Sequence, residues 1–379
     1  MEKRALRRLA LVCASELTLK AFLLEHIRAL ARHYEVTVIA DSGDRNLLRK
    51  LGIPVELMPV PIARDIAPLR DLRALARLTS IFRSKDFDLV HSVTPKAGLL
   101  AMAAAFIARV PLRLHTFTGQ VWVTRGGFMR ALLKAADQAI AAMATHVLAD
   151  SRSQLDFMLQ QGITNAGKAG VLAQGSIAGV DLERFKPDAA ARARVRAGLG
   201  VDADALVFLY LGRLRRDKGV LDLCRAFARV ARPKLLLLAV GPDEEGLGPQ
   251  MRLDCTSQLR LVDYTAEPEA YFAAADVFCL PSYREGFGTV IIEAAAAGLP
   301  AIGSRIYGIT DAIVENETGL LFPAGDVDAL AAAMRRFIEE TGLRACMGES
   351  ARRRVGRDFS AAVLTEALLD FYRSLPSPC

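Results

Sequence analysis

The chain alternates between short apolar runs and longer amphipathic stretches along nearly its whole length. In the first half, five apolar runs predict β-strands: RRLALVCA, YEVTVIAD, DLVHSVT, LRLHTFT and HVLADS. In the second half, six more predict strands: ALVFLYLG, KLLLLAVG, LRLVDY, DVFCLPS, PAIGS and GLLFP. Between the strands lie segments with helical periodicity, such as 21–32, 69–83 and 130–144. Because apolar strands that alternate with helices are typical of parallel sheets covered on both faces, the pattern predicts two doubly wound α/β domains.

The boundary between the two domains is predicted in AQGSIAGVDLERFKPDAA, near residues 175–189, where glycine, proline and turn residues cluster. The length of 379 residues suits two domains. The predicted divisions are 1–180, 181–360 and 361–379. The last division is a helix over about 361–374 that has no following strand, so we expect it to pack back on the first domain.

Two segments imitate membrane elements. The opening MEKRALRRLALVCAS has basic and then apolar residues, as a signal peptide has, but its apolar part ends at Ala14 and Glu16 follows at once. A first buried strand is the preferred interpretation. The longest uncharged apolar run, 97–108, is shorter than the roughly 20 residues that a membrane span needs. It predicts a core helix, and the sequence predicts no transmembrane segment.

The cysteine spacing and the charge distribution indicate the compartment and the partners of the protein. The six cysteines are scattered without CxxC spacing, which favours a reducing cytosol over a disulfide scaffold or a zinc site. Residues 1–180 hold 24 Lys and Arg against 14 Asp and Glu, whereas the remainder holds 25 against 28. The basic first half indicates an anionic partner, either a membrane surface or a phosphorylated acceptor, or else only a solubilising surface. Because no nucleic-acid-binding signature accompanies the charge, we expect no nucleic-acid partner.

The first candidate for chemistry is the loop GRLRRDKG at 212–219, which follows the strand ALVFLYLG. Gly212 lets the chain turn tightly, and Arg213 and Lys218 then stand at the mouth of the sheet. An arginine fork and a lysine point charge suit a diphosphate. A solvated basic loop is the alternative.

The second candidate is YREGFGTVIIEAAAAGLP at 283–300. A helix is predicted over 289–297, and the free N–H groups of its first turn favour an anion such as phosphate. Glu285 and Glu293 lie on either side of the turn that opens this helix. Because ionised carboxylates only accept hydrogen bonds, they suit hydroxyl groups. A nucleoside diphosphate sugar has this layout, with a sugar and a ribose at its ends; a dipole-stabilising Glu285 and a surface Glu293 are the alternatives.

Together with DAIVENETGLLFPAGDVDALAAAM, these stretches resemble the donor domain of the family-four retaining glycosyltransferases, the group 1 family, whose signature is the E-x7-E pair. The resemblance is strong over about 200–340 and looser elsewhere, through AGVDLERFKP and HSVTPKAGLL. It implies the GT-B fold, an α/β architecture of two Rossmann-like, doubly wound parallel-sheet domains. They face each other across a cleft with the active site, and a C-terminal helix crosses back to the first domain.

The resemblance also implies roles for individual residues. Arg213 and Lys218 stabilise the donor diphosphate and the leaving nucleotide, Glu285 binds hydroxyls of the transferred sugar, and Glu293 holds the ribose. The other residues assigned to donor binding are Gly212, Gly286, Phe287, Gly288, Thr289, Val290 and Ser15, with backbone N–H groups near 286–290 contacting sugar or phosphate.

Neither a metal nor a cofactor is expected. The strings DFD and DVD imitate a metal-binding DxD motif. However, Asp86 and Asp88 lead into a strand, whereas Asp326 and Asp328 open a helix.

The first domain departs from the family pattern. Many relatives carry a histidine in a T-x-H-G turn beside the transferred sugar, and here HTFTGQ places Thr118 at that position. Its hydroxyl can bond the sugar but cannot act as an imidazole. Ser15 and Glu16 also replace the paired glycines usual after the first strand. The candidates for acceptor contact are His91, His115, Gln120 and Trp122, with core burial as the alternative.

The resemblance therefore predicts a retaining, metal-independent glycosyltransferase. It would move a hexose or N-acetylhexosamine from a UDP-sugar to a hydroxyl of a polyprenyl-linked or other lipid-linked saccharide, in polysaccharide or lipopolysaccharide synthesis. Its expected place is the cytoplasm, peripheral on the inner membrane, with the basic first domain facing the anionic leaflet. A nucleotide-sugar epimerase of the same fold and a non-catalytic nucleotide-sugar-binding scaffold stay open as alternatives.

Overall fold

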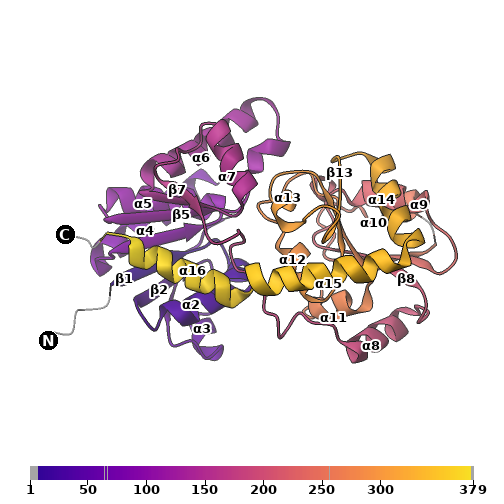
Figure 1. The fold of residues 1–379 in the computed structure, drawn as a ribbon. Helices are drawn as coiled ribbons and strands as arrows, with labels where there is room; N and C mark the ends of the chain where they lie inside the picture. The colour runs from indigo at the N-terminus through magenta and orange to yellow at the C-terminus, as the bar shows by residue number, and fades with distance from the viewer. Residues whose placement is uncertain (1–6, 64, 66, 256, 377–379) are drawn as a thin grey trace. The chain divides into compact units, whose positions relative to one another are not determined.

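The structure, a computed structural model, describes residues 7–63, 65, 67–255 and 257–376 (Figure 1). The ends of the predicted first and last divisions, 1–6 and 377–379, lie outside this range. By their internal contacts, the described residues up to 178 and from 364 onward form one unit, and the described residues of 179–363 form another.

The described part of the first unit contains a seven-stranded parallel sheet in the order β3-β2-β1-β4-β5-β6-β7. Its strands are β1 (Arg8–Val12), β2 (Glu35–Ala40), β3 (Glu56–Pro59), β4 (Leu89–Val93), β5 (Leu112–Phe117), β6 (His146–Ala149) and β7 (Ala169–Val171). All five strands predicted for this half are present. The two strands that were not predicted, β3 and β7, form the edges of the sheet, and neither is fully buried along its length.

Helices cover both faces of this sheet. They are α1 (Glu16–Thr18), the π-helical η1 (Leu19–Leu23), α2 (Leu24–Leu30), α3 (Leu47–Lys50), α4 (Pro68–Lys85), α5 (Pro95–Ile107), the 3₁₀ turn η2 (Val121–Thr124), α6 (Gly127–Met143), α7 (Arg152–Gln160) and α16 (Ala361–Ser374). Side chains of α4, α5, α6 and α7 fill the core on one face. Side chains of η1, α2, α3 and α16 fill the core on the other. The predicted core helix at 97–108 is confirmed as α5, whereas the helix expected to begin at residue 21 begins at Glu16.

The second unit contains a six-stranded parallel sheet in the order β10-β9-β8-β11-β12-β13, again within the described residues. Its strands are β8 (Leu206–Leu211), β9 (Leu235–Val240), β10 (Leu259–Val262), β11 (Val277–Leu280), β12 (Ala301–Ser304) and β13 (Gly319–Phe322). Its helices are α8 (Ala189–Leu199), the 3₁₀ turn η3 (Arg216–Lys218), α9 (Val220–Ala228), α10 (Gly248–Asp254), α11 (Pro268–Ala274), α12 (Thr289–Ala296), α13 (Ile309–Ala312), α14 (Val327–Glu339) and α15 (Thr341–Asp358). All six predicted strands are present.

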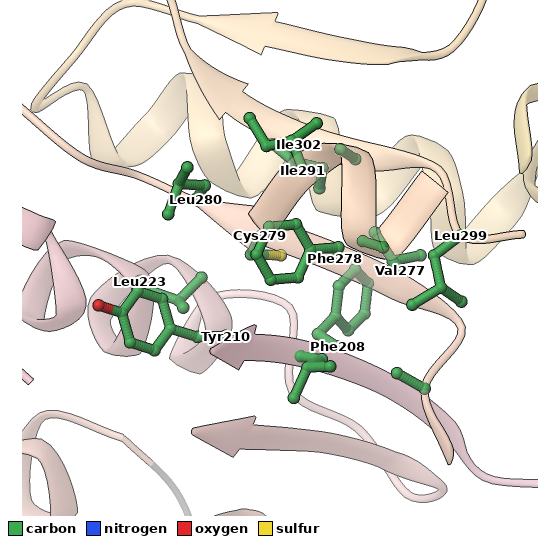
Figure 2. Close-up of a cluster of buried hydrophobic side chains, with 14 of the residues drawn as sticks. Phe208, Tyr210, Leu223, Val277, Phe278, Cys279, Leu280, Ile291, Leu299 and Ile302 are labelled. Atoms are coloured by element: carbon green, nitrogen blue, oxygen red, sulfur yellow. The ribbon is translucent and has the colours of Figure 1, made fainter. Parts of the chain in front are cut away.

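The centre of the second sheet is apolar on both faces. Figure 2 shows Phe208 and Tyr210 of β8 beside Val277, Phe278 and other side chains of β11. Two-sided burial explains why these strands read as nearly continuous apolar runs in the sequence. The prediction of two Rossmann-like α/β domains is confirmed.

The order in which successive strands are added reverses once in each sheet. The reversal lies between β1 and β4 in the first unit and between β8 and β11 in the second. At such a switch point the neighbouring connections leave toward opposite faces, so a crevice opens beyond the carboxyl ends of the strands. Ligands of open parallel sheets bind there. The loops after β8 and β11 are therefore where a ligand of the second unit is expected.

The C-terminal helix α16 completes the first unit. Leu368, Leu369 and Tyr372 lie in the core formed by α2, α3 and the sheet. The Tyr372 hydroxyl shares a hydrogen bond of 2.6 Å with His91 Nδ1, and Thr365 Oγ1 shares one of 3.0 Å with His26 Nδ1. Among the described residues, no helix has both the length and the apolar character needed to span a membrane.

Candidate active site

The loop after β8 approaches the loop after β11 as closely as backbone allows. Gly219 has a φ of +70°, and a Cβ there would lie 2.0 Å from the Pro281 carbonyl oxygen. Tyr283 N–H also donates to the Asp217 carbonyl oxygen at 3.0 Å. Only glycine permits both this backbone conformation and this approach. The two loops at the switch point of the second sheet are therefore joined by backbone contacts.

Two side chains predicted for different parts of the donor meet across this junction. Lys218 Nζ lies 2.6 Å from Glu285 Oε1, and both side chains are more than four-fifths buried. The Ser282 hydroxyl donates to the same oxygen at 2.8 Å. Glu285 Oε2 has no hydrogen bond within the described part of the chain. Because Oε1 already receives two donors, a hydroxyl-bearing ligand is expected to donate to Oε2.

The second predicted cation, Arg213, lies on the outside of the same loop. Its guanidinium is 3.3 Å from Glu244 in the loop after β9, and Arg215 is also 3.3 Å from that carboxylate. Arg215 bonds Asp217 as well, at 3.0 Å. The positive charge of the basic loop is thus balanced by acidic residues of the same loop and of the neighbouring loop after β9. The sequence analysis missed this balance. The signal was the acidic run DEE at 243–245, directly after a strand that neighbours β8.

The glycine-bearing turn leads into α12 as predicted. Gly288, with a φ of +79°, precedes the helix, and no side chain caps the first turn. The first-turn N–H groups are therefore not satisfied by a capping side chain, as an anion site requires. Phe287 is 1% exposed and packs against Phe359 at 5.1 Å between ring centroids. Its side chain fixes the turn on the core, so only its backbone is placed to contact a ligand.

Glu293 lies in the second turn of α12 and is largely buried rather than a freely solvated helix residue. Burial raises its pKa to about 7; the nearby Glu269 carboxylate adds to this effect, and the Arg184 guanidinium opposes it. The carboxyl group has no hydrogen-bond partner among residues 7–63, 65, 67–255 and 257–376. Donors from a ligand would satisfy it and favour its charged form.

In the first unit, two of the predicted residues lie where a ligand could reach them. Ser15 follows β1, is partly exposed, and caps α1 by accepting from Thr18 N–H at 3.3 Å. Thr118 directly follows β5 and is also partly exposed. Both therefore lie at the carboxyl edge of the first sheet.

The two candidate acceptor histidines are interior residues, and this corrects the prediction. His91 bonds Tyr372 and Thr116, and it lines a cavity of about 20 Å³, room for about one water molecule. His115 is fully buried and bonds Ser92 Oγ at 2.8 Å. Burial lowers the pKa of each histidine to about 3, so both rings are neutral. Their alternative reading as core residues is the one that the structure supports.

Gln120 and Trp122 are also buried, which corrects their assignment to the acceptor. The Trp122 indole N–H donates to Asp137 Oδ2 at 2.8 Å, and its ring stacks on Phe157. Gln120 Oε1 accepts from Gln154 Nε2 at 3.4 Å. A tryptophan whose polar N–H is satisfied inside the unit acts as a packing anchor.

The strings that imitate DxD motifs have local structural roles. Asp326 caps α14 by accepting from Ala329 N–H at 2.9 Å, as expected. Asp88 accepts from Arg8 N–H at 2.8 Å as the chain enters β4. In the described part of the chain, no group of three or more His, Cys, Asp or Glu residues could hold a metal ion.

The chain is similar to glycosyltransferases in two family comparisons. Residues 191–354 match the family described as "Glycosyl transferases group 1", and residues 19–172 match "Glycosyl transferase 4-like domain". The capsular polysaccharide biosynthesis glycosyltransferase CapM of Staphylococcus aureus is 31% identical over 322 residues, which cover 83% of this chain and 84% of CapM. An Escherichia coli UDP-Gal:alpha-D-GlcNAc-diphosphoundecaprenol alpha-1,3-galactosyltransferase is 26% identical, covering 82% of this chain and 81% of that enzyme.

Solved structures share the fold. Anabaena Alr3699/HepE in complex with UDP and glucose aligns with a TM-score of 0.81 and 22% identity, over 97% of this chain and all of that chain. WaaG, a glycosyltransferase involved in lipopolysaccharide biosynthesis, aligns with a TM-score of 0.72 and 19% identity, again over 97% of this chain and all of WaaG. These alignments confirm the predicted fold class.

Proposed function

The chain belongs to the group 1 glycosyltransferases, and we propose that it transfers a hexose or N-acetylhexosamine from a UDP-sugar to a hydroxyl of a lipid-linked saccharide. The name of the E. coli relative gives a UDP-sugar donor and a diphosphoundecaprenol-linked acceptor. CapM and WaaG are named for capsular polysaccharide and lipopolysaccharide biosynthesis. HepE was crystallised with UDP and glucose. These names support cell-surface polysaccharide synthesis as the setting.

The observation that carries the proposal is the contact between Lys218 and Glu285 at the switch point of the second sheet. The ammonium group belongs to the loop that would hold the diphosphate, and the carboxylate still has one oxygen for a sugar hydroxyl. A UDP-sugar requires these two chemistries side by side, because its diphosphate is bonded directly to its transferred sugar. The uncapped first turn of α12 adds N–H donors for the same anion.

In the proposed reaction the leaving group is stabilised by charge already in place. The bond between the anomeric carbon and the diphosphate oxygen breaks, and a bond to the acceptor oxygen forms on the same face, so configuration is retained. The acceptor proton passes to the departing phosphate. Lys218 and Arg213 balance the charge that develops on the diphosphate, and preorganised charges of this kind are worth several kcal/mol. No step is assigned to a metal.

The proposal is tested by turnover of two single variants with matched controls. Lys218→Ala and Glu285→Ala should each lower kcat/KM at least about tenfold, because both contacts strengthen as the leaving group departs. Lys234→Ala and Glu349→Ala change exposed residues outside these loops and should stay near wild-type activity. Transfer to polyprenyl-diphosphate-linked acceptors is measured after a donor screen by thermal shift. Near-native turnover in Lys218→Ala or Glu285→Ala would contradict the assigned site.

The same screen separates the alternatives. A nucleotide-sugar epimerase would produce a new sugar nucleotide from UDP-GlcNAc alone, without any acceptor. A binding scaffold would give a thermal shift with UDP but no product with any acceptor.

A further inference from the structure

The first turns of α6 are unusually apolar on their outer side. All nine residues from Thr124 to Leu132 are exposed. Phe128 is 80% exposed, Met129 41% and Leu132 43%. A surface helix normally turns such side chains toward the core. We call Arg125, Phe128, Met129, Arg130 and Leu132 the α6 patch.

A second exposed apolar pair lies at the start of α4. Leu69 is 74% exposed and Leu72 is 62% exposed, with exposed Arg70 and Arg73 beside them. Helices α4 and α6 both pack against α5, so they lie on the same face of the first sheet. Because these helices return antiparallel to the strands, their first turns lie at the carboxyl edge, where Thr118 follows β5. Two packing steps of about 10 Å place the two starts roughly 20 Å apart.

The sequence stretch that carries the α6 patch has charges of a single sign. No acidic residue occurs between Asp88 and Asp137, whereas this stretch contains six basic residues: Lys96, Arg109, Arg113, Arg125, Arg130 and Lys134. Arg125 and Arg130 form no salt bridge with any described residue. Arg130 lies over the Trp122 ring at 5.4 Å and is thereby held beside the exposed side chains. Asp137 is buried against Trp122 and adds no exposed negative charge.

We propose that the α6 patch docks the protein on an anionic bilayer. Phe128, Met129 and Leu132 enter the boundary between head groups and acyl chains, and Arg125 and Arg130 contact anionic head groups. This inference rests on the proposed function, because a lipid-linked acceptor has to be met at a membrane. Docking through the first turns of α6 brings the edge that carries Thr118 toward that surface.

The charge pattern favours a bilayer over a second copy of the chain. A two-fold interface pairs a patch with itself, so the arginines of one copy would meet the arginines of the other. The stretch supplies no carboxylate to balance them. An anionic lipid surface complements both halves of the patch, because it offers negative head groups above an apolar layer.

The test is flotation of the full chain with vesicles of phosphatidylcholine, with and without phosphatidylglycerol. Wild type should float with phosphatidylglycerol vesicles at low salt. The triple variant Phe128→Ser, Met129→Ser and Leu132→Ser should bind at least tenfold less, and Arg125→Ser about fivefold less. The matched control Leu253→Ser removes an 84% exposed leucine of the second unit and should bind as wild type does. A thermal shift with UDP in every variant shows that the second unit is intact.

Three results would overturn the docking proposal. One is equal flotation of the triple variant and the wild type. Another is absence of flotation together with a dimer, seen by sedimentation equilibrium, that the triple variant dissociates, since the patch would then bind protein. Flotation needs neither donor nor acceptor, so its failure is distinguishable from failure of the proposed transfer reaction. Normal transfer to a short-chain, water-soluble acceptor without vesicle binding would contradict docking alone.

Discussion

The residues of the candidate site differ in how far sequence could describe them. Lys218 and Glu285 could be assigned to one site because each follows a strand, and strand ends share an edge in a parallel sheet. Their direct contact could not be predicted, because it depends on the close approach at Gly219. His91, His115 and Trp122 carry reactive or recognition chemistry by residue type, yet they are buried. Side-chain burial is set by the packing of α5, α6 and α16, which a linear pattern does not specify.

Glu293 is predicted to make donor binding depend on pH. Its raised pKa of about 7 means that it takes up a proton as pH falls through neutrality. Ribose hydroxyls donate best to the carboxylate, so UDP affinity should fall below about pH 7 and proton release should accompany binding near pH 7. Calorimetry in buffers of different ionisation enthalpy measures that release. Glu293→Gln should bind more weakly and release no proton; pH-independent binding by wild type would contradict the role of Glu293.

Glu244 is predicted to compete with the donor for Arg213. Its carboxylate contacts both Arg213 and Arg215, and a diphosphate would need the guanidinium group of Arg213. Because exposed pairs are worth at most about 1 kcal/mol, Glu244→Gln should raise UDP affinity up to about fivefold. Titration calorimetry measures this change, with Glu183→Gln, at another exposed pair, as the control. Weaker binding by Glu244→Gln would show that the carboxylate supports the loop instead of competing with the donor.

At the scale of elements, the interior strands of both sheets and the edge strands of the second sheet were predictable, whereas the edge strands of the first sheet were not. Strands such as LLLLAV are fully buried, so their sequence is continuously apolar. The edge strands ELMP and AGV are short and only partly buried, and they carry no such signal. The helix after β1 begins five residues earlier than expected and contains the π-helical segment η1. Its apolar period is therefore interrupted, which explains the displaced prediction.

The junction between the loops after β8 and β11 depends on Gly219, which gives an element-scale prediction. Gly219→Ala adds a methyl group 2.0 Å from the Pro281 carbonyl oxygen as well as a strained φ. We expect a loss of about 2 kcal/mol or more in the free energy of unfolding, together with weaker UDP binding, because the loops must separate. The control is Gly200→Ala, which has a similar φ of +63° and no atom within 4 Å of the added Cβ. Gly200→Ala should lower the free energy of unfolding by only about 1 kcal/mol. Equal losses in urea titrations of the two variants would refute the argument.

At the scale of the whole molecule, the two units have separate apolar cores. The core of the second unit is built from residues of 180–359. The core that receives α16 is built from the first unit and closes over Tyr372, which is fully buried, contacts Tyr34 edge to face and bonds His91. Of the residues predicted to bind the donor, Arg213, Lys218, Glu285 and Glu293 belong to the second unit, and Ser15 belongs to the first. Stability of the first unit and nucleotide binding should therefore be separable.

Tyr372→Ala tests that separation. Removing a fully buried aromatic side chain lowers the free energy of unfolding by about 3–5 kcal/mol. The first unit should be destabilised, because Tyr372 packs in the core of that unit. In scanning calorimetry we expect the transition temperature of the first unit to be lowered and that of the second unit to be unchanged. UDP should raise only the transition temperature of the second unit. Tyr264→Ala, at a 69% exposed tyrosine, should leave the transition of the first unit unchanged. If Tyr372→Ala abolished the UDP shift while the protein stayed folded, nucleotide binding would depend on the first unit, and the assignment of the main nucleotide contacts to the second unit would fail.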